Sequence, residues 1–240
     1  MTVLAIDTHG PTLAVGLYCH MSPRASGQTY KHVRRAGLTH SSTLAPAIEC
    51  LYSTADASVQ DTDLIAVSAG PGSFTGLRIG MASAKGIAAA SGADIVSVPT
   101  LAAICRSYRY WDGVVLAAID ARKSRFYVRA EHSAEVLVQD ADMTPSDALA
   151  TIRSGRSKVE PARLLVVGPG ALQLSEASKP QSDTWVIDAD PDREYLTSLT
   201  EMGFELWKDQ GPDDAAAGPH YLRRGDVGTP AKQRHPHASL

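Results

Sequence analysis

The run from Gly70 to Gly80, Gly-Pro-Gly-Ser-Phe-Thr-Gly-Leu-Arg-Ile-Gly, is the segment with the clearest potential for chemistry. It follows Leu64 to Ser68, an apolar stretch typical of a buried strand, and leads into a helix predicted from about Phe74 to Ala90. A strand, a glycine turn and a helix start in this order expose backbone N–H groups that bind anions. The run lacks the lysine of a Walker loop and the clean spacing of a dinucleotide-binding loop.

Two other interpretations of this run remain open. Its glycines could serve only a tight turn and close helix packing. Alternatively, small residues recurring at three- to four-residue steps form a face that lets another helix approach closely, which favours a docking surface. We predict a partner interface on this helix and on an apolar stripe of a preceding helix, and we expect Ala84→Glu to abolish pairing while the monomer stays folded. The predicted interface residues are Leu44, Ile48, Leu51, Gly76, Leu77, Gly80, Met81, Ala84 and Lys85.

Two aspartates follow apolar strands and could be metal-associated carboxylates in a nucleotide cleft. Asp7 opens a turn with Thr8 and Gly10, whereas the turn after Asp120 has no glycine and is crowded with basic side chains, which we interpret as a solvated loop. An ATPase of this architecture needs two phosphate-binding turns, and here one looks eroded. The residues of this possible vestigial nucleotide cleft are Asp7, Thr8, Gly10, Asp120, Gly168 and Gly170.

The sequence offers little for other chemistry. The eight histidines form no HExxH motif and no pair four residues apart, and the three cysteines have no metal spacing. There is no G-x-S-x-G elbow for a nucleophilic serine. We therefore predict no catalytic residues and no metal site.

The elements that would position these residues occur twice. The strand and aspartate of Val3–Asp7 are echoed by Leu116–Asp120, and the strand and glycine turn of Leu64–Gly72 are echoed by Leu164–Gly170. Both echoes occur in the same order, which indicates two lobes of one topology. The sequence predicts an α/β protein.

The predicted lobes differ in size. The first covers residues 1–105, and the second, which is reduced, covers 106–190. A helix at about 192–209 is expected to pack back on the first lobe. Residues 210–240 form a C-terminal extension, with a mobile tail expected after about residue 225.

Composition limits the functional classes. The 240 residues are 44% hydrophobic and 20% charged, which is typical of a globular protein. The formal net charge of −3 lacks the basic surplus of a protein that binds nucleic acid unaided, so any tRNA contact is expected to be indirect. An odd number of separated cysteines, with neither a signal peptide nor a membrane span in view, favours a cytoplasmic protein.

Several motifs together resemble the TsaB (YeaZ-like) family of tRNA threonylcarbamoyladenosine biosynthesis proteins, over about residues 1 to 224. They are Leu4–Thr8, His40-Ser41, Gly70–Gly80, Ile119–Arg122 with Tyr127, and Pro219–Arg223. This chain departs from the family at His9-Gly10-Pro11 and at Gly168-Pro169-Gly170, both beside the possible nucleotide cleft.

The resemblance implies an actin-like (ASKHA, ribonuclease H-like) fold and a non-catalytic subunit. Such a subunit binds and activates the catalytic paralogue TsaD through two first-lobe helices, is joined by the ATPase TsaE, and forms a homodimer when alone. It implies no cofactor for this chain, since ATP is used by the assembled complex. Two rivals are kept: an ATP-binding kinase or ATPase with Asp7 as the magnesium-associated carboxylate, and a peptidase acting on a partner.

Overall fold

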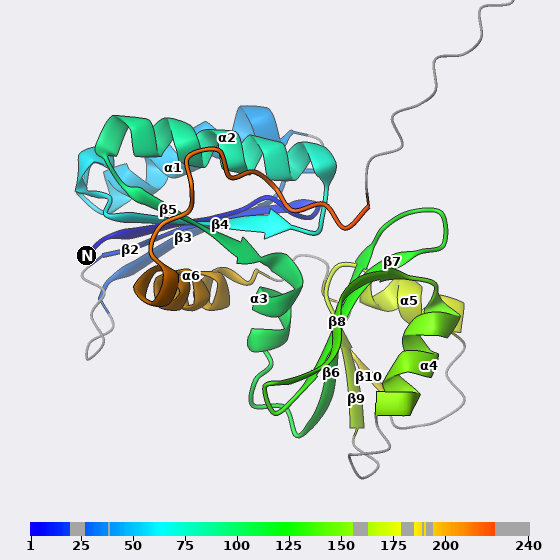
Figure 1. The fold of residues 1–240 in the computed structure, drawn as a ribbon. Helices are drawn as coiled ribbons and strands as arrows, with labels where there is room; N and C mark the ends of the chain where they lie inside the picture. The colour runs from blue at the N-terminus through cyan, green and yellow to red at the C-terminus, as the bar shows by residue number, and fades with distance from the viewer. Residues whose placement is uncertain are drawn as a thin grey trace, which may run out of the picture.

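The chain folds into two α/β lobes, each built on one five-stranded mixed sheet (Figure 1). The expected mobile tail lies outside the described residues. The computed structural model describes residues 1–19, 27–37, 39–155, 163–178, 185–188, 190 and 194–223.

The first sheet has the strand order β3-β2-β1-β4-β5. Strand β1 runs antiparallel to β2 and parallel to β4. Every residue of β1, β2 and β4 is buried, because helices cover both faces, and this explains their continuous apolar sequences. The strands are β1 (Val3–Asp7), β2 (Thr12–Tyr18), β3 (Thr29–Arg35), β4 (Leu64–Gly70) and β5 (Asp94–Pro99).

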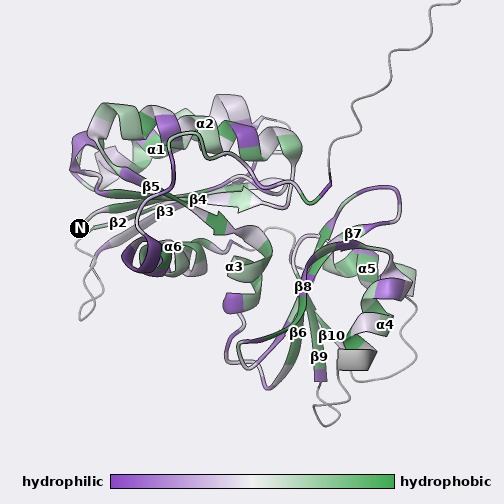
Figure 2. Cartoon of the chain, in the orientation of Figure 1, coloured by the Kyte–Doolittle hydropathy of each residue, from purple (hydrophilic) through white to green (hydrophobic). Residues whose placement is uncertain are grey.

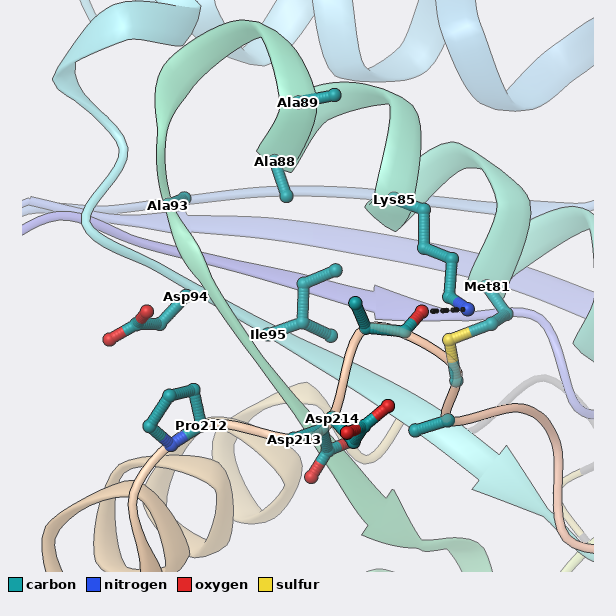
Figure 3. A pocket seen from close by; sticks show the side chains of 12 residues that line it. Met81, Lys85, Ala88, Ala89, Ala93, Asp94, Ile95, Pro212, Asp213 and Asp214 are labelled. Carbon is teal, nitrogen blue, oxygen red and sulfur yellow. Dashed lines mark hydrogen bonds between the residues drawn. The ribbon is translucent and has the colours of Figure 1, made fainter.

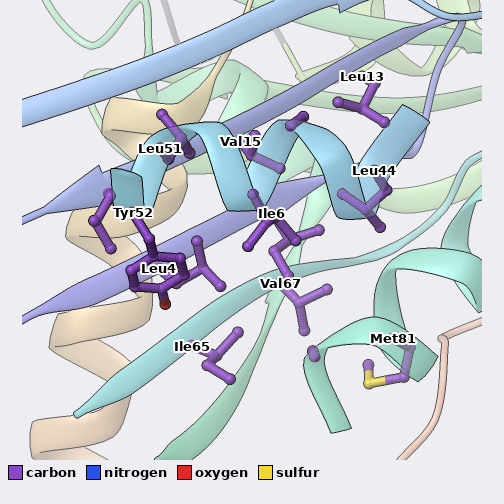
Figure 4. Close-up of a cluster of buried hydrophobic side chains, with 14 of the residues drawn as sticks. Leu4, Ile6, Leu13, Val15, Leu44, Leu51, Tyr52, Ile65, Val67 and Met81 are labelled. Atoms are coloured by element: carbon purple, nitrogen blue, oxygen red, sulfur yellow. The ribbon is translucent and has the colours of Figure 1, made fainter. Parts of the chain in front are cut away.

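Helices α1 and α2 cover one face of this sheet, and α6 covers the opposite face (Figure 1). Figure 4 shows Leu44 and Leu51 of α1 and Met81 of α2 in one buried cluster with Ile6 and Val67 of the sheet. The apolar stripes of both helices are therefore used inside the lobe. The elements are α1 (His40–Thr54), α2 (Phe74–Ser91), α6 (Leu196–Gln210) and a short 3-10 helix, η1 (Val59–Asp61).

Helix α3 (Thr100–Arg106) joins the two lobes. Its Leu101 and Ile104 are fully buried in a cluster with Val115 and Leu165 of the second sheet. The helix also packs against α6 beneath the first sheet. The two lobes therefore share a hydrophobic core at this junction.

The second sheet, in the order β10-β9-β6-β7-β8, repeats the first. Adding five to each strand number of the first sheet gives the same set of neighbours, and β6 is again antiparallel to β7 and parallel to β9. The predicted duplication is confirmed. The elements are β6 (Gly113–Asp120), β7 (Phe126–His132), β8 (Glu135–Met143), α4 (Pro145–Gly155), β9 (Arg163–Val167), α5 (Ala171–Ser178) and β10 (Trp185–Ile187).

The second lobe is the smaller one in its helices. Its α4 and α5 have 11 and 8 residues, compared with 15 and 18 residues for α1 and α2. The first lobe therefore presents the larger helical surface.

Residues 211–223, which we call the strap, run from the end of α6 across the first lobe to the second (Figure 1). The His220 N–H donates to Ala69 O at the end of β4, at 2.7 Å. The Arg223 Nε donates to Asp142 Oδ2 of β8, at 2.9 Å. The strap therefore ties the first lobe to the second.

Candidate functional site

A cleft of about 550 Å³ lies between the lobes, where the sequence predicted a nucleotide cleft. The β1–β2 turn and the start of α2 supply one wall, and the β6–β7 turn and the start of α5 supply the other. The lining residues are His9, Gly10, Pro11, Gly37, Gly72, Ser73, Phe74, Ile119, Asp120, Ala121, Arg122, Tyr127, Pro169 and Gln173.

Asp7 is buried and held by the turn that it opens. Its Oδ1 accepts hydrogen bonds from the His9 N–H at 3.2 Å and from His9 Nδ1 at 2.6 Å. Burial alone would raise the pKa of Asp7, but the electrostatic attraction and hydrogen bonds of His9 outweigh it, so the pKa lies below the ordinary value of 3.8. The Asp7 carboxylate thus stabilises the β1–β2 turn through His9, which weakens the case for Asp7 as a magnesium-associated group.

Asp120 repeats this arrangement in the second lobe. Its Oδ1 accepts the Arg122 N–H at 2.7 Å, and the Arg122 guanidinium lies 3.4 Å from Oδ2. Both aspartates therefore accept a hydrogen bond from the backbone two residues later, which is the geometry of an Asx turn. A structural role in each turn explains the repeated aspartate without a bound ion.

The glycines predicted for the second-lobe side of the cleft are packing residues. A Cβ atom on Gly168 would lie 2.7 Å from Ala118 O, and one on Gly170 would lie 2.7 Å from the Asp120 N atom. Both glycines are buried against β6 in the second lobe. Thr8, the predicted cleft residue of the first lobe, is also buried. Of the six predicted cleft residues, Gly10 and Asp120 line the cleft, and Asp7 lines a smaller neighbouring cavity.

The glycine run at the start of α2 packs on the β1–β2 turn. A Cβ atom on Gly76 would collide with Thr8 O, one on Gly80 with Thr8 Oγ1, and one on Gly72 would lie 2.6 Å from His9 O. The Thr8 hydroxyl donates to Gly76 O at 2.8 Å. Close packing, one of the two alternatives left open by the sequence, therefore explains these glycines.

Two of the N–H groups that the anion-site interpretation of the same run would use are engaged within the chain. The Ser73 N–H donates to His9 O at 2.7 Å, and the Gly76 N–H donates to the Ser73 hydroxyl at 3.2 Å. These two N–H groups are therefore used within the chain.

Two other classes of site receive no support in the part of the chain that the structure describes. Among these residues, no group of three or more His, Cys, Asp or Glu side chains is placed to hold a metal ion. No described helix has the length and apolar character needed to cross a bilayer.

The predicted partner interface requires correction. Eight of its members are buried in the first lobe, and the ninth, Lys85, is half-buried and donates from Nζ to Ala215 O of the strap at 2.8 Å. Because Ala84 has no exposed surface, Ala84→Glu would disrupt the core rather than a contact surface. The buried members are Leu44, Ile48, Leu51, Gly76, Leu77, Gly80, Met81 and Ala84.

The opposite side of the same two helices is exposed and, beyond Phe74 and Arg78 in the first turns of α2, consists mostly of small residues. In Figure 2, α1 and α2 are mostly white and green with a few purple, hydrophilic segments, whereas the last turns of α6 are purple. A Cβ atom on Gly86 would have no neighbour within 4 Å. We call this surface the outer face; it consists of Ser42, Ala45, Pro46, Glu49, Ser53, Ala82, Gly86, Ala89 and Ala90.

The outer face suits the close approach of another helix. Its residues recur at three- and four-residue steps on each helix, and α1 packs against α2, so the two stripes adjoin. Short side chains allow helix backbones to approach closely, and Glu49 is the one charged member of the set. The predicted helices thus remain a candidate docking site, through their other side.

The structure also brings together residues that the sequence analysis did not connect. Arg223 bonds Asp142 in the second lobe, and Arg78 of α2 donates to the Tyr221 hydroxyl at 3.0 Å. These partners are 81 and 143 residues apart in the chain, so no local pattern links them. The pairing of His9 with Asp7 had a local signal, the spacing of two residues across a tight turn.

Comparison with known proteins finds relatives named for tRNA threonylcarbamoyladenosine biosynthesis. A family model described as "TsaD: tRNA N6-adenosine threonylcarbamoyltransferase" matches residues 33–177, which is more than half of the chain. The chain is 35% identical over 127 residues to the tRNA threonylcarbamoyladenosine biosynthesis protein TsaB of Bacillus subtilis, and 33% identical over 129 residues to that of Escherichia coli. Each match covers 53% of both proteins, so the chain spans about half the length of these curated relatives.

A solved structure extends the likeness over nearly the whole fold. YeaZ from Pseudomonas aeruginosa is similar with a TM-score of 0.71 and 25% identity, covering 92% of this chain and 99% of that one. The predicted α/β fold of two related lobes is confirmed by the duplicated sheets, and this match extends over both lobes. The chain belongs to the TsaB/YeaZ family.

Proposed function

We propose that this chain acts in the biosynthesis of tRNA N6-threonylcarbamoyladenosine as a non-catalytic subunit that binds and activates TsaD. Its curated relatives carry the name of that pathway, and the matching family model carries the name of the transferase. On this proposal the chain works in the cytoplasm, and its contact with tRNA is made through the partner.

The observation that carries the proposal is the outer face. Nine exposed residues on two adjoining helices include eight without charge, and their side chains are short. When another helix packs on a surface of this kind, little favourable hydration of charged groups is lost, and short side chains lose little conformational entropy. The matching helices of TsaD, or of a second copy of this chain when TsaD is absent, would complete a helical bundle.

The interlobar cleft supports the non-catalytic part of the proposal. Asp7 and Asp120 are both engaged by their own turns, and the Ser73 and Gly76 N–H groups at the start of α2 bond within the chain. We propose that ATP is used elsewhere in the assembly, with the ATPase TsaE as a further partner, and that this chain carries no cofactor.

Activation follows from binding if TsaD has two arrangements. A subunit that binds the active arrangement more tightly raises its population by that difference in affinity, without taking part in the chemistry. The chain then contributes a docking surface and a rigid support for it.

The test is a charge placed on the outer face. Ala82→Glu on α2 would bury an unpaired carboxylate at the proposed interface, at a cost of about 3–5 kcal/mol, which corresponds to at least about a 100-fold loss of affinity for TsaD. Because Ala82 is exposed in the single chain, the variant should keep the wild-type fold, which circular dichroism checks.

Ala150→Glu provides the matched control, since Ala150 is an exposed alanine within α4 of the second lobe. Isothermal titration of each variant with TsaD should give wild-type affinity for Ala150→Glu. Wild-type affinity for a folded Ala82→Glu variant would overturn the proposed interface.

A further inference from the structure

A second cavity, of about 360 Å³, lies beside the outer face, between α2, β5 and the strap (Figure 3). This volume is at the lower end of the range of protein ligand pockets, about 300–1,000 Å³. Ala89 belongs both to this cavity and to the outer face. The lining residues are Met81, Lys85, Ala88, Ala89, Ala93, Asp94, Ile95, Pro212, Asp213, Asp214, Ala215 and Ala217.

The strap forms one wall of this cavity, and hydrogen bonds hold it on both sides. The Asp213 N–H donates to Ile95 O at 2.8 Å, and the Ser97 N–H donates to Asp213 Oδ2 at 2.8 Å, so the strap follows the edge of β5. On the other side, Lys85 of α2 donates to Ala215 O at 2.8 Å. The cavity is therefore bounded by anchored backbone.

The lining combines an apolar floor with acidic groups. Met81, Ala88, Ala89, Ala93 and Ile95 supply the floor, and Figure 3 shows Ile95 at its centre between α2 and the strap.

Three carboxylates and one ammonium line the cavity, which leaves an excess of negative charge. Asp94 Oδ2 accepts from Trp207 Nε1, and Asp214 Oδ1 accepts from the Ala216 N–H, so hydrogen bonds fix the positions of these carboxylates. The only lining ammonium, that of Lys85, is directed at the strap carbonyl. The last turn of α2 adds the negative end of the helix dipole. A ligand that fits this lining has an aliphatic stem and a cationic head.

We propose that this cavity receives a lysine or arginine side chain of the protein that docks on the outer face. The stem would lie on the alanine, methionine and isoleucine floor, and the cation would lie among Asp94, Asp213 and Asp214. The identity of the presenting protein rests on the proposed function, whereas the chemistry of the occupant rests on the charge and shape of the cavity. Together they make the cavity a determinant of partner specificity.

The first test needs no partner. Methyl-labelled protein, observed by NMR, is titrated with Nα-acetyl-arginine methylamide and with the isosteric, uncharged Nα-acetyl-citrulline methylamide. We expect saturable shifts of the Met81, Ala88 and Ile95 methyl groups with the arginine probe and at least about threefold weaker binding of the citrulline probe. Equal binding of the two probes, or no shift of these methyl groups with the arginine probe, overturns the proposal.

The second test removes charge and keeps the hydrogen bonds. In Asp213→Asn/Asp214→Asn, the amide oxygens can still accept from the Ser97 and Ala216 N–H groups. We expect this variant to bind the arginine probe, and TsaD, about threefold to tenfold more weakly than wild type. Unchanged probe affinity overturns the proposal.

Comparison with Ala82→Glu separates the two hypotheses. If Ala82→Glu abolishes TsaD binding and the double variant binds TsaD as wild type does, the cavity proposal fails and the proposed function stands. If Ala82→Glu stays folded and binds TsaD normally, the proposed interface fails, and the arginine probe alone then decides the chemistry of the cavity.

Discussion

Two glycines on α2 allow a direct test of how this helix is positioned. Gly76 faces the β1–β2 turn, where an added Cβ atom would collide with Thr8 O. Gly86 lies about 2.8 helical turns later, is exposed, and would place a Cβ atom in open space. Replacing each with alanine adds the same methyl group to the same helix in opposite environments.

The expected magnitudes follow from these environments. Alanine is favoured over glycine in a helix interior by about 1 kcal/mol, so Gly86→Ala should raise the free energy of unfolding by about that amount. Gly76→Ala gains the same helix preference, but the Thr8 carbonyl is backbone and α2 must shift, at a cost of about 1–3 kcal/mol for overpacking. The difference in free energy of unfolding between the two variants should therefore be about 1–3 kcal/mol, with Gly76→Ala the less stable.

Urea denaturation followed by circular dichroism measures this difference, and thermal melts should move by about 2–4 °C per kcal/mol for a chain of this size. Equal stabilisation by both substitutions would refute the close packing of α2 on the β1–β2 turn. That result would return Gly72, Gly76 and Gly80 to the interpretations that the sequence left open.

Two further predictions concern the strap and the first-lobe turn. Arg223→Ala removes hydrogen bonds to Asp142 and to Ala121 O and should lower the free energy of unfolding by about 1–3 kcal/mol in urea titrations. The control is Arg122→Ala, whose side chain is 87% exposed, and this variant should stay within about 0.5 kcal/mol of wild type. An equal loss of stability in both variants would argue against a strap between the lobes. Because the folded-state pKa of Asp7 lies below its ordinary value, ionised Asp7 stabilises the fold above that ordinary value, and this stabilisation is lost as the pH falls through the folded-state pKa. The free energy of unfolding should therefore fall less for Asp7→Asn than for wild type between about pH 5 and pH 3, and parallel pH profiles would contradict the pairing with His9.

The sequence predicted the architecture well because the architecture is repeated locally. An apolar strand ending in an aspartate, at Asp7 and again at Asp120, marks the same turn in each lobe, and the two glycine turns mark the next parallel strand. Each of these signals spans only a few consecutive residues, so it is visible in the sequence alone.

The orientation of the helices was not predictable in the same way. Gly80 and Gly86 look alike in the sequence, yet Gly80 contacts Thr8 and Gly86 faces outward, because only the position of the β1–β2 turn distinguishes them. The stripe of Leu44, Ile48 and Leu51 was assigned to a partner, but an amphipathic helix on a sheet turns such a stripe toward its own core.

The strap was beyond prediction because it depends on contacts distant in sequence. Its Tyr221 meets Arg78 and its Arg223 meets Asp142 only after both lobes have folded. The motif at Pro219–Arg223 is visible in the sequence, but its partners are not.

Hydrogen–deuterium exchange of this chain, alone and saturated with TsaD, tests the central claim most directly. If the chain is a docking subunit, amide exchange should slow in peptides covering α1 and α2 and stay unchanged in the β6–β7 turn at residues 120–125. Slower exchange at that turn and in the cleft, with α1 and α2 unaffected, would contradict the claim and assign the function to the space between the lobes.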